Sequence, residues 1–157
     1  MRRFTLISIT FLLFISTCSL GQSTSQWSAD FQFGADFMSR YIWRGLNLGG
    51  AGPSIQPTLK LNVGNSNHLF SVGGWGAYTF SNTANQEADL FLSYTFKSMI
   101  TLTVTDYFFP ELNTGSKDKY FCYSKDSTGH VFEGAIQFNG TKKIPFTLMV
   151  ATNFYGN

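Results

Sequence analysis

Hydrophobic and polar residues alternate along residues 88–109, and the same alternation recurs through most of the chain. From Ala88 to Phe96, every second residue is apolar or aromatic, and the residues between them are mostly polar. A break at Lys97-Ser98 follows, after which the alternation resumes and continues to Phe109. A period of two residues is typical of β-strands whose two faces meet different surroundings. These segments therefore predict a β-hairpin. Each of its strands has about ten residues, which is long enough to span a bilayer at a tilt.

Five further segments continue this pattern and raise the expected number of strands to about seven. The expected strands are Phe31–Trp43, Ser54–Val63, Leu69–Phe80, His130–Phe138 and Pro145–Tyr155. Within the second of them, Pro57 lacks a backbone donor and predicts a bulge or an unpaired position.

The connections between the expected strands alternate in length. They are longer after the first, third and fifth strands and shorter after the second, fourth and sixth, as in outer-membrane barrels. The sequence thus predicts an all-β fold, an antiparallel up-and-down transmembrane β-barrel over residues 31–157. Single-chain bacterial barrels have an even number of strands, so a count of about seven predicts an incomplete barrel in a C-terminally truncated chain.

The N-terminus has the layout of a secretion signal. Arg2 and Arg3 precede an apolar stretch, and small residues precede a cleavage position after Gly21. We expect a signal peptide at residues 1–21, a polar lead at residues 22–30, and export to the bacterial outer membrane. A permanent membrane anchor is the alternative, but the apolar stretch is short for a spanning helix.

Composition supports a barrel in lipid more than a soluble domain. Charged residues make up 13% of the chain, against roughly 25% in ordinary globular domains. Aromatic residues make up 17%, and the mean hydropathy is −0.02, as expected when apolar and polar residues alternate. The net charge is +2 without any run of Lys or Arg, so no nucleic-acid partner is expected.

One segment resembles a known family. SRYIWRGLNLGGAGPSIQPTL (Ser39 to Leu59), with its Trp43-Arg44-Gly45 motif, resembles the first hairpin of the TorF-type porin family, and EADLFLSYTF and TVTDYFFP resemble later strands of the same family. The resemblance covers most of Phe31 to Gly156. It implies an outer-membrane β-barrel channel that lets small solutes or ions diffuse passively. Members of that family tend to be longer, which also implies a truncated chain here.

Charged residues at polar positions of the alternation are expected to line the pore. They are Arg40, Arg44, Lys60, Glu87, Asp89 and Glu133. One hypothesis is that they select which ions or solutes pass. The other is that they pair across a narrow interior and plug it, as side chains do in barrels of about eight strands. For a chain of this size the second hypothesis is the stronger one.

Aromatic residues cluster at the ends of the expected strands. Those predicted to form interfacial girdles are Tyr41, Trp43, Tyr78, Phe80, Tyr94, Phe96, Tyr107 and Phe109. The alternatives are a soluble aromatic core or a platform for carbohydrate.

Catalytic chemistry is not indicated by the sequence. His68 and His130 are the two histidines, and His130 lies near Ser127 and Glu133, but their spacing specifies no triad. We therefore expect no enzyme, no metal site and no cofactor, with membrane lipid and small solutes or ions as partners. Two further hypotheses stay open: a non-channel structural or adhesive barrel, and a secreted soluble β-sandwich that binds a partner.

Overall fold

The structure is a computed structural model that describes residues 26–80, 86–110, 119–124 and 128–156. The expected signal peptide and residues 22–25 of the expected lead lie outside these ranges. The strands are β1 (Ser28–Met38), β2 (Ile42–Trp43), β3 (Leu46–Asn47), β4 (Ser54–Gly64), β5 (His68–Thr79), β6 (Glu87–Phe96), β7 (Ile100–Phe108), β8 (His130–Phe138) and β9 (Leu148–Tyr155). None of the described segments is a helix that is long and apolar enough to cross a membrane.

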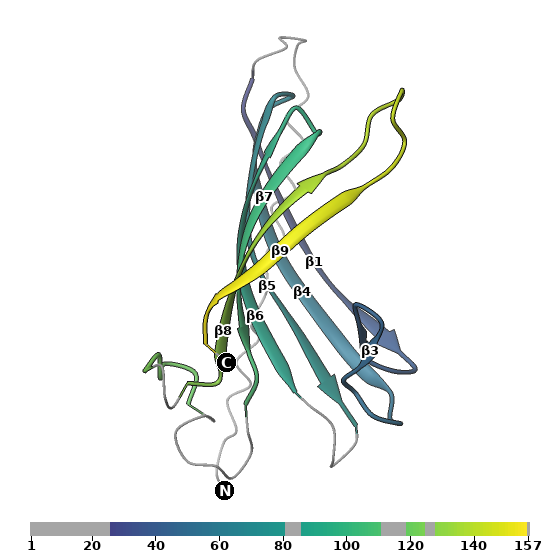
Figure 1. The fold of residues 1–157 in the computed structure, drawn as a ribbon, viewed down its shortest axis with the longest axis vertical. Coiled ribbons are helices and arrows are strands. Elements are labelled where there is room, and N and C mark those ends of the chain that lie inside the picture. The colour runs from purple at the N-terminus through teal and green to yellow at the C-terminus, as the bar shows by residue number, and fades with distance from the viewer. Residues whose placement is uncertain (1–25, 81–85, 111–118, 125–127, 157) are drawn as a thin grey trace, which may run out of the picture.

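Seven strands form one antiparallel sheet in the order β1-β4-β5-β6-β7-β8-β9. Apart from the small β2–β3 hairpin, each strand pairs with the next along the chain, which confirms the predicted up-and-down topology. The sheet is not closed into a barrel: β1 and β9 are its two edges in the described chain. Figure 1 shows that the sheet is strongly twisted, with β9 crossing the middle strands at a steep angle in this view.

The turns and the proline follow the sequence predictions. Lys97 and Ser98 have φ values of 48° and 56°, so the tight turn between β6 and β7 lies where the alternation breaks. Pro57 pairs with Ala35 of β1, but the ladder between β4 and β5 omits Gln56 and Pro57 without a change of register. This confirms the unpaired position expected at Pro57.

Three strand boundaries differ from the predictions by more than one residue. β1 begins at Ser28, within the expected lead, instead of at Phe31. β1 ends at Met38 instead of continuing to Trp43, because the chain turns back at Arg44-Gly45 and pairs β2 with β3. β9 begins at Leu148 instead of Pro145, because backbone hydrogen bonds between Thr141 and Ile144 form a longer connection.

The two faces of the sheet differ sharply in polarity. On one face, large apolar side chains are exposed, including Phe33 (78%), Leu92 (59%) and Val150 (63%). On the other face, polar side chains are buried, including Glu87 (1%) and Glu133 (5%). A globular domain has the reverse distribution. We call these the outer face and the inner face, and their alternation along each strand is the one that the sequence predicted.

Connections of different length emerge at opposite ends of the sheet. Residues 39–53, 80–86 and 109–129 form the connections after the first, third and fifth strands of the seven-stranded sheet, and residues 65–67, 97–99 and 139–147 form those after the second, fourth and sixth. The predicted alternation in length is confirmed for the first five connections. It fails at the sixth, because β9 begins at Leu148 and residues 139–147 are more numerous than residues 80–86. Residues 39–53, which contain β2 and β3, are called the inner loop below because they pack against the inner face.

Candidate functional site

The inner loop is attached to the middle of the sheet through Tyr41. The side chain of Tyr41 is 1% exposed, and its hydroxyl group donates a hydrogen bond to the carboxylate of Glu87 on β6. Its ring lies 5.6 Å from the ring of Trp75 on β5. The amides of Leu48 and Gly49 each donate to the carbonyl oxygen of Tyr41 at 3.1 Å, which closes the loop around this anchor. The loop is therefore fixed over β5 and β6.

The Trp43-Arg44-Gly45 motif forms the turn of the β2–β3 hairpin. Arg44 and Gly45 have φ values of 44° and 84°, the positive angles that a two-residue type I′ turn needs. Glycine adopts this left-handed conformation freely, whereas for an L-residue such as Arg44 the conformation costs about 1–2 kcal/mol. The strained position places the guanidinium group at the tip of the inner loop.

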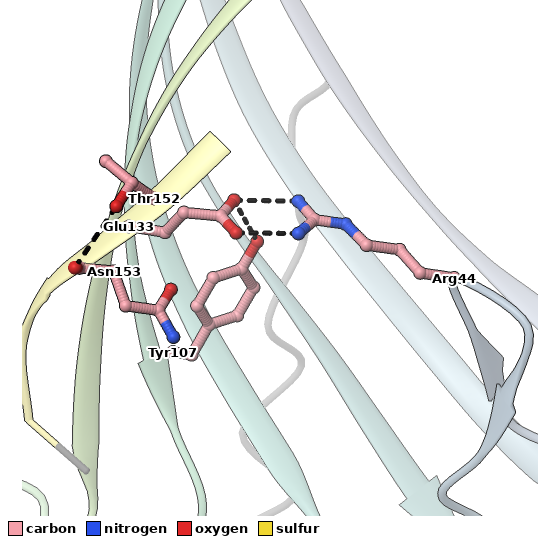
Figure 2. A network of polar contacts seen from close by, with 5 residues as sticks. All are labelled: Arg44, Tyr107, Glu133, Thr152 and Asn153. Carbon is pink, nitrogen blue, oxygen red and sulfur yellow. Dashed lines mark hydrogen bonds and ion pairs between the residues drawn. The ribbon is translucent and has the colours of Figure 1, made fainter. Parts of the chain in front are cut away.

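Arg44 forms an ion pair with Glu133 of β8, far across the sheet from the strands that flank the loop (Figure 2). The guanidinium nitrogens Nη1 and Nη2 lie 2.6 and 2.7 Å from the two carboxylate oxygens, a bidentate geometry. The hydroxyl group of Tyr107 also donates to this carboxylate at 3.0 Å. The hydrogen bond to Glu133 raises the pKa of Arg44 above its usual value, so the guanidinium stays charged.

Glu87 and Asp89 form a second acidic group on the inner face. They are two residues apart on β6, so both side chains leave the same face, and both are buried. One oxygen of each, Oε1 of Glu87 and Oδ1 of Asp89, has no hydrogen-bond partner in the described chain. These buried carboxyl groups lie beneath the Tyr41 anchor.

The structure thus brings together four of the six expected pore-lining residues in two groups, Arg44 with Glu133 and Glu87 with Asp89. Lys60 also lies on the inner face, opposite Gln32 of β1, and is half-buried. Arg40 is exposed in the inner loop and not on a strand, because β1 ends before it. Within the described ranges, neither Arg40 nor Lys60 forms an ion pair.

The aromatic residues expected in girdles divide between the two faces. Tyr78, Phe80, Tyr94 and Phe96 lie on the outer side of the sheet. Tyr41 and Trp43 lie in the inner loop, and Tyr107 and Phe109 lie with them on the inner side. A girdle must face lipid, so that interpretation does not fit these last four residues. The ring of Trp43 meets Tyr107 edge-on at 5.9 Å, which fixes the loop to β7.

Other aromatic residues on the outer face were not among the predicted ones. Trp27 stacks on Phe70 at 6.1 Å, and Phe70 lies 4.9 Å from Tyr94. The Nδ1 atom of His68 is 2.7 Å from the hydroxyl oxygen of Tyr94. These residues lie near the short connection at residues 65–67, and Phe70 occupies an apolar position of the strand alternation. That position could have identified Phe70 as an aromatic residue of the outer face.

His130 occupies an unexpected site on the outer face. Its Nδ1 atom lies 2.6 Å from Asp106 Oδ1, and its Nε2 atom faces the carbonyl oxygen of Tyr120. Each ring nitrogen of His130 thus faces an oxygen atom. The rings of Phe108 and Tyr123 lie 4.7 and 4.3 Å away. Burial and the nearby Asp106 raise the pKa of Tyr120, which keeps this phenol neutral.

This geometry changes the partner that the sequence suggested for His130. Glu133 lies on the inner face, whereas His130 and Asp106 lie on the outer face, so Glu133 cannot pair with His130. Ser127 lies outside the described residues. Asp106 was missed because it occupies an apolar position in the alternation of β7. Nδ1 of His130 on β8 contacts Asp106 of β7 and Nε2 contacts Tyr120, so the ring connects residues 119–124 to these two strands.

We expect the replacement His130→Leu to release residues 119–124 from the sheet. Leucine keeps much of the buried volume but removes both hydrogen bonds, so cleavage by trypsin after Lys119 should become faster. His68→Leu is the matched control, because this histidine lies at the opposite end of the strands and should leave that cleavage rate unchanged. Equal rates for His130→Leu and the unmodified chain would show that the contact does not hold the segment.

Gly49 allows the close contact at the Tyr41 anchor. A Cβ atom at position 49 would lie 2.6 Å from Tyr41 Cβ and 3.0 Å from Thr79 Cγ2. We expect Gly49→Ala to destabilise the folded chain by about 1–3 kcal/mol, as measured by urea unfolding, because the loop must shift to relieve this overlap. Gly34→Ala is the control, since a Cβ there meets nothing within 4 Å. A similar loss in both variants would contradict the packing at Gly49.

Comparison with protein-family models, with curated proteins and with solved structures finds no match for this chain. Its function must therefore be argued from the geometry. No group of three or more His, Cys, Asp or Glu residues is placed to hold a metal ion in the part of the chain that the structure describes. What the site offers is a polar inner surface, a loop tied across it at two points, and an apolar surface on the outside.

Proposed function

We propose that this chain is a porin-like outer-membrane β-barrel protein through which small solutes or ions diffuse passively. The outer face contacts membrane lipid, the inner face lines the lumen, and the inner loop narrows it. The expected signal peptide at residues 1–21 would direct the chain to that membrane. The resemblance to the TorF-type porin family is consistent with this assignment.

The observation that carries the proposal is the polarity of the two faces. Large side chains such as Phe33, Phe37 and Leu92 are more than half exposed on the outer face, whereas Glu87 and Glu133 are almost fully buried on the inner face. Apolar surface in contact with water costs about 25 cal/mol per Å². Hydrocarbon around the outer face removes this cost, and water in the lumen solvates the inner face.

The proposal requires partners for the two edges of the sheet. Lipid cannot hydrogen-bond to the free backbone groups of an edge strand, so the edges of β1 and β9 must be paired in a membrane. We propose that further strands pair with these two edges and close the barrel. The final strand number sets the lumen diameter.

The test is conductance across a planar lipid bilayer. We expect the full-length protein to remain in the membrane fraction when membranes are washed with carbonate. In the planar bilayer it should give discrete conductance steps. Release by carbonate or high salt would instead support the soluble β-sandwich. In the described chain no second layer of protein covers the outer face, which favours the membrane assignment over the sandwich.

A non-channel barrel with a structural or adhesive role is the second candidate. It is favoured by the inner loop, which is tied to β6 through Tyr41 and to β8 through Arg44 and thus occupies part of the inner side. A protein that is assembled in the membrane but gives no conductance would support this candidate over the porin.

A further inference from the structure

A hollow of about 330 Å³ lies between the β2–β3 hairpin and the inner side of the sheet. Its walls are almost entirely apolar, and three of them are aromatic rings. The lining residues are Trp43, Leu46, Leu48, Tyr107, Phe109, Val131 and Asn153. Hollows of this size are in the range that binds small molecules, and a smaller apolar cavity can hold a benzene ring.

The composition of this hollow differs from that of the inner face around it. Along β7, the inner positions preceding Tyr107 are threonines, and inner positions of β4 carry Thr58, Lys60 and Asn62. Leu46 is 57% exposed even though it belongs to the hollow, so the packing of the loop does not cover it. Apolar side chains left open on a polar surface mark a site of interaction.

One polar group in the hollow is free to contact a ligand. The side-chain amide of Asn153 on β9 forms no hydrogen bond in the described ranges, and Figure 2 shows it beside the ring of Tyr107. The hydroxyl group of Tyr107, in contrast, is engaged by Glu133 at 3.0 Å. A ring-shaped ligand could therefore pack against the aromatic walls and hydrogen-bond to Asn153.

We propose that the hollow between the β2–β3 hairpin and strands β7–β9 binds a small aromatic solute that carries a hydroxyl group. This proposal rests on the proposed function and deepens it, because the hollow would be a binding site for the diffusing solute on the inner side of the barrel. The Trp43 and Phe109 rings contact the aromatic ring of the solute, and the Asn153 amide selects its hydroxyl group.

The test uses 4-fluorophenol as the probe and fluorine NMR to follow its binding to the full chain in detergent micelles. Val131→Trp puts a bulky side chain into the hollow and should weaken binding by about tenfold or more, which corresponds to roughly 1.4 kcal/mol. The matched control is Ala135→Trp, because Ala135 lies on the inner face of the same strand but outside the hollow. This variant should bind as the unmodified chain does.

A second variant tests the polar contact and does not depend on filling the hollow. Asn153→Leu should weaken binding of 4-fluorophenol by about tenfold, the loss expected for one well-formed hydrogen bond. It should leave the binding of fluorobenzene, which has no hydroxyl group, unchanged. Equal loss for both probes would overturn the role of Asn153, and equal 4-fluorophenol binding by Val131→Trp and the unmodified chain would overturn the site.

Conductance of the same preparations separates this proposal from the proposed function. Conductance without saturable 4-fluorophenol binding would overturn the binding site and leave the porin assignment intact. Saturable binding that Val131→Trp abolishes, without conductance, would support the binding site and count against the porin.

Discussion

We expect Leu102→Arg to impair folding into lipid by about 1–4 kcal/mol, because an arginine on the lipid-facing surface costs more the deeper it lies in the bilayer. Leu102 is the third of the nine residues of β7 and is 48% exposed on the outer face, between Tyr94 and Ile136 on the neighbouring strands. The measurement is the free energy of unfolding by urea in lipid vesicles.

Thr103→Arg is the matched control for this prediction. Thr103 follows Leu102 directly but points to the inner face, where it pairs with Ser93 and Ala135. A charge on the water-filled side should be tolerated. Equal destabilisation by both substitutions would mean that lipid does not cover the outer face, and the porin proposal would be abandoned.

We expect the ion pair between Arg44 and Glu133 to couple the inner loop to β8. A double-mutant cycle of Arg44→Ala and Glu133→Ala should give a coupling energy of about 1–3 kcal/mol by urea unfolding, because the pair is bidentate and Glu133 is buried. Arg44→Ala should also increase conductance, because the tip of the loop loses its attachment to the wall.

The control for the ion pair is Lys60→Ala. Lys60 is also a cation on the inner face, but it forms no ion pair in the described chain, so its removal should change stability little. If Arg44→Ala leaves conductance unchanged while the coupling energy is present, the loop is attached to β8 without narrowing the path. A coupling energy near zero would contradict the contact itself.

The strands and their faces could be predicted because their cause is local. Each residue of a strand points to the side opposite its neighbours, so alternation alone assigns Leu102 outward and Thr103 inward. The unpaired position at Pro57 and the turn at Lys97-Ser98 likewise follow from the conformations open to these residues. The first strand was predicted too long because the alternation continues through Tyr41 and Trp43 after the chain has left the sheet.

The partners of the charged residues could not be predicted in the same way. Arg44 and Glu133 are 89 residues apart, and nothing in the spacing of either indicates the other. The same is true of Tyr41 with Glu87 and of Asp106 with His130. These contacts depend on where the inner loop and residues 119–124 fold back, which the alternation does not describe.

By itself, the sequence determined that this protein is an antiparallel sheet with one apolar and one polar face. The reason is that successive side chains of any strand point to opposite faces, so the alternation assigns the faces of each strand without knowledge of the others. Only the tertiary structure decided that the inner loop lies across the polar face, that Arg44 reaches Glu133, and that His130 holds a loop segment on the outside. Such contacts join segments that are distant in the chain, and their energy becomes available only once the strands between them have paired.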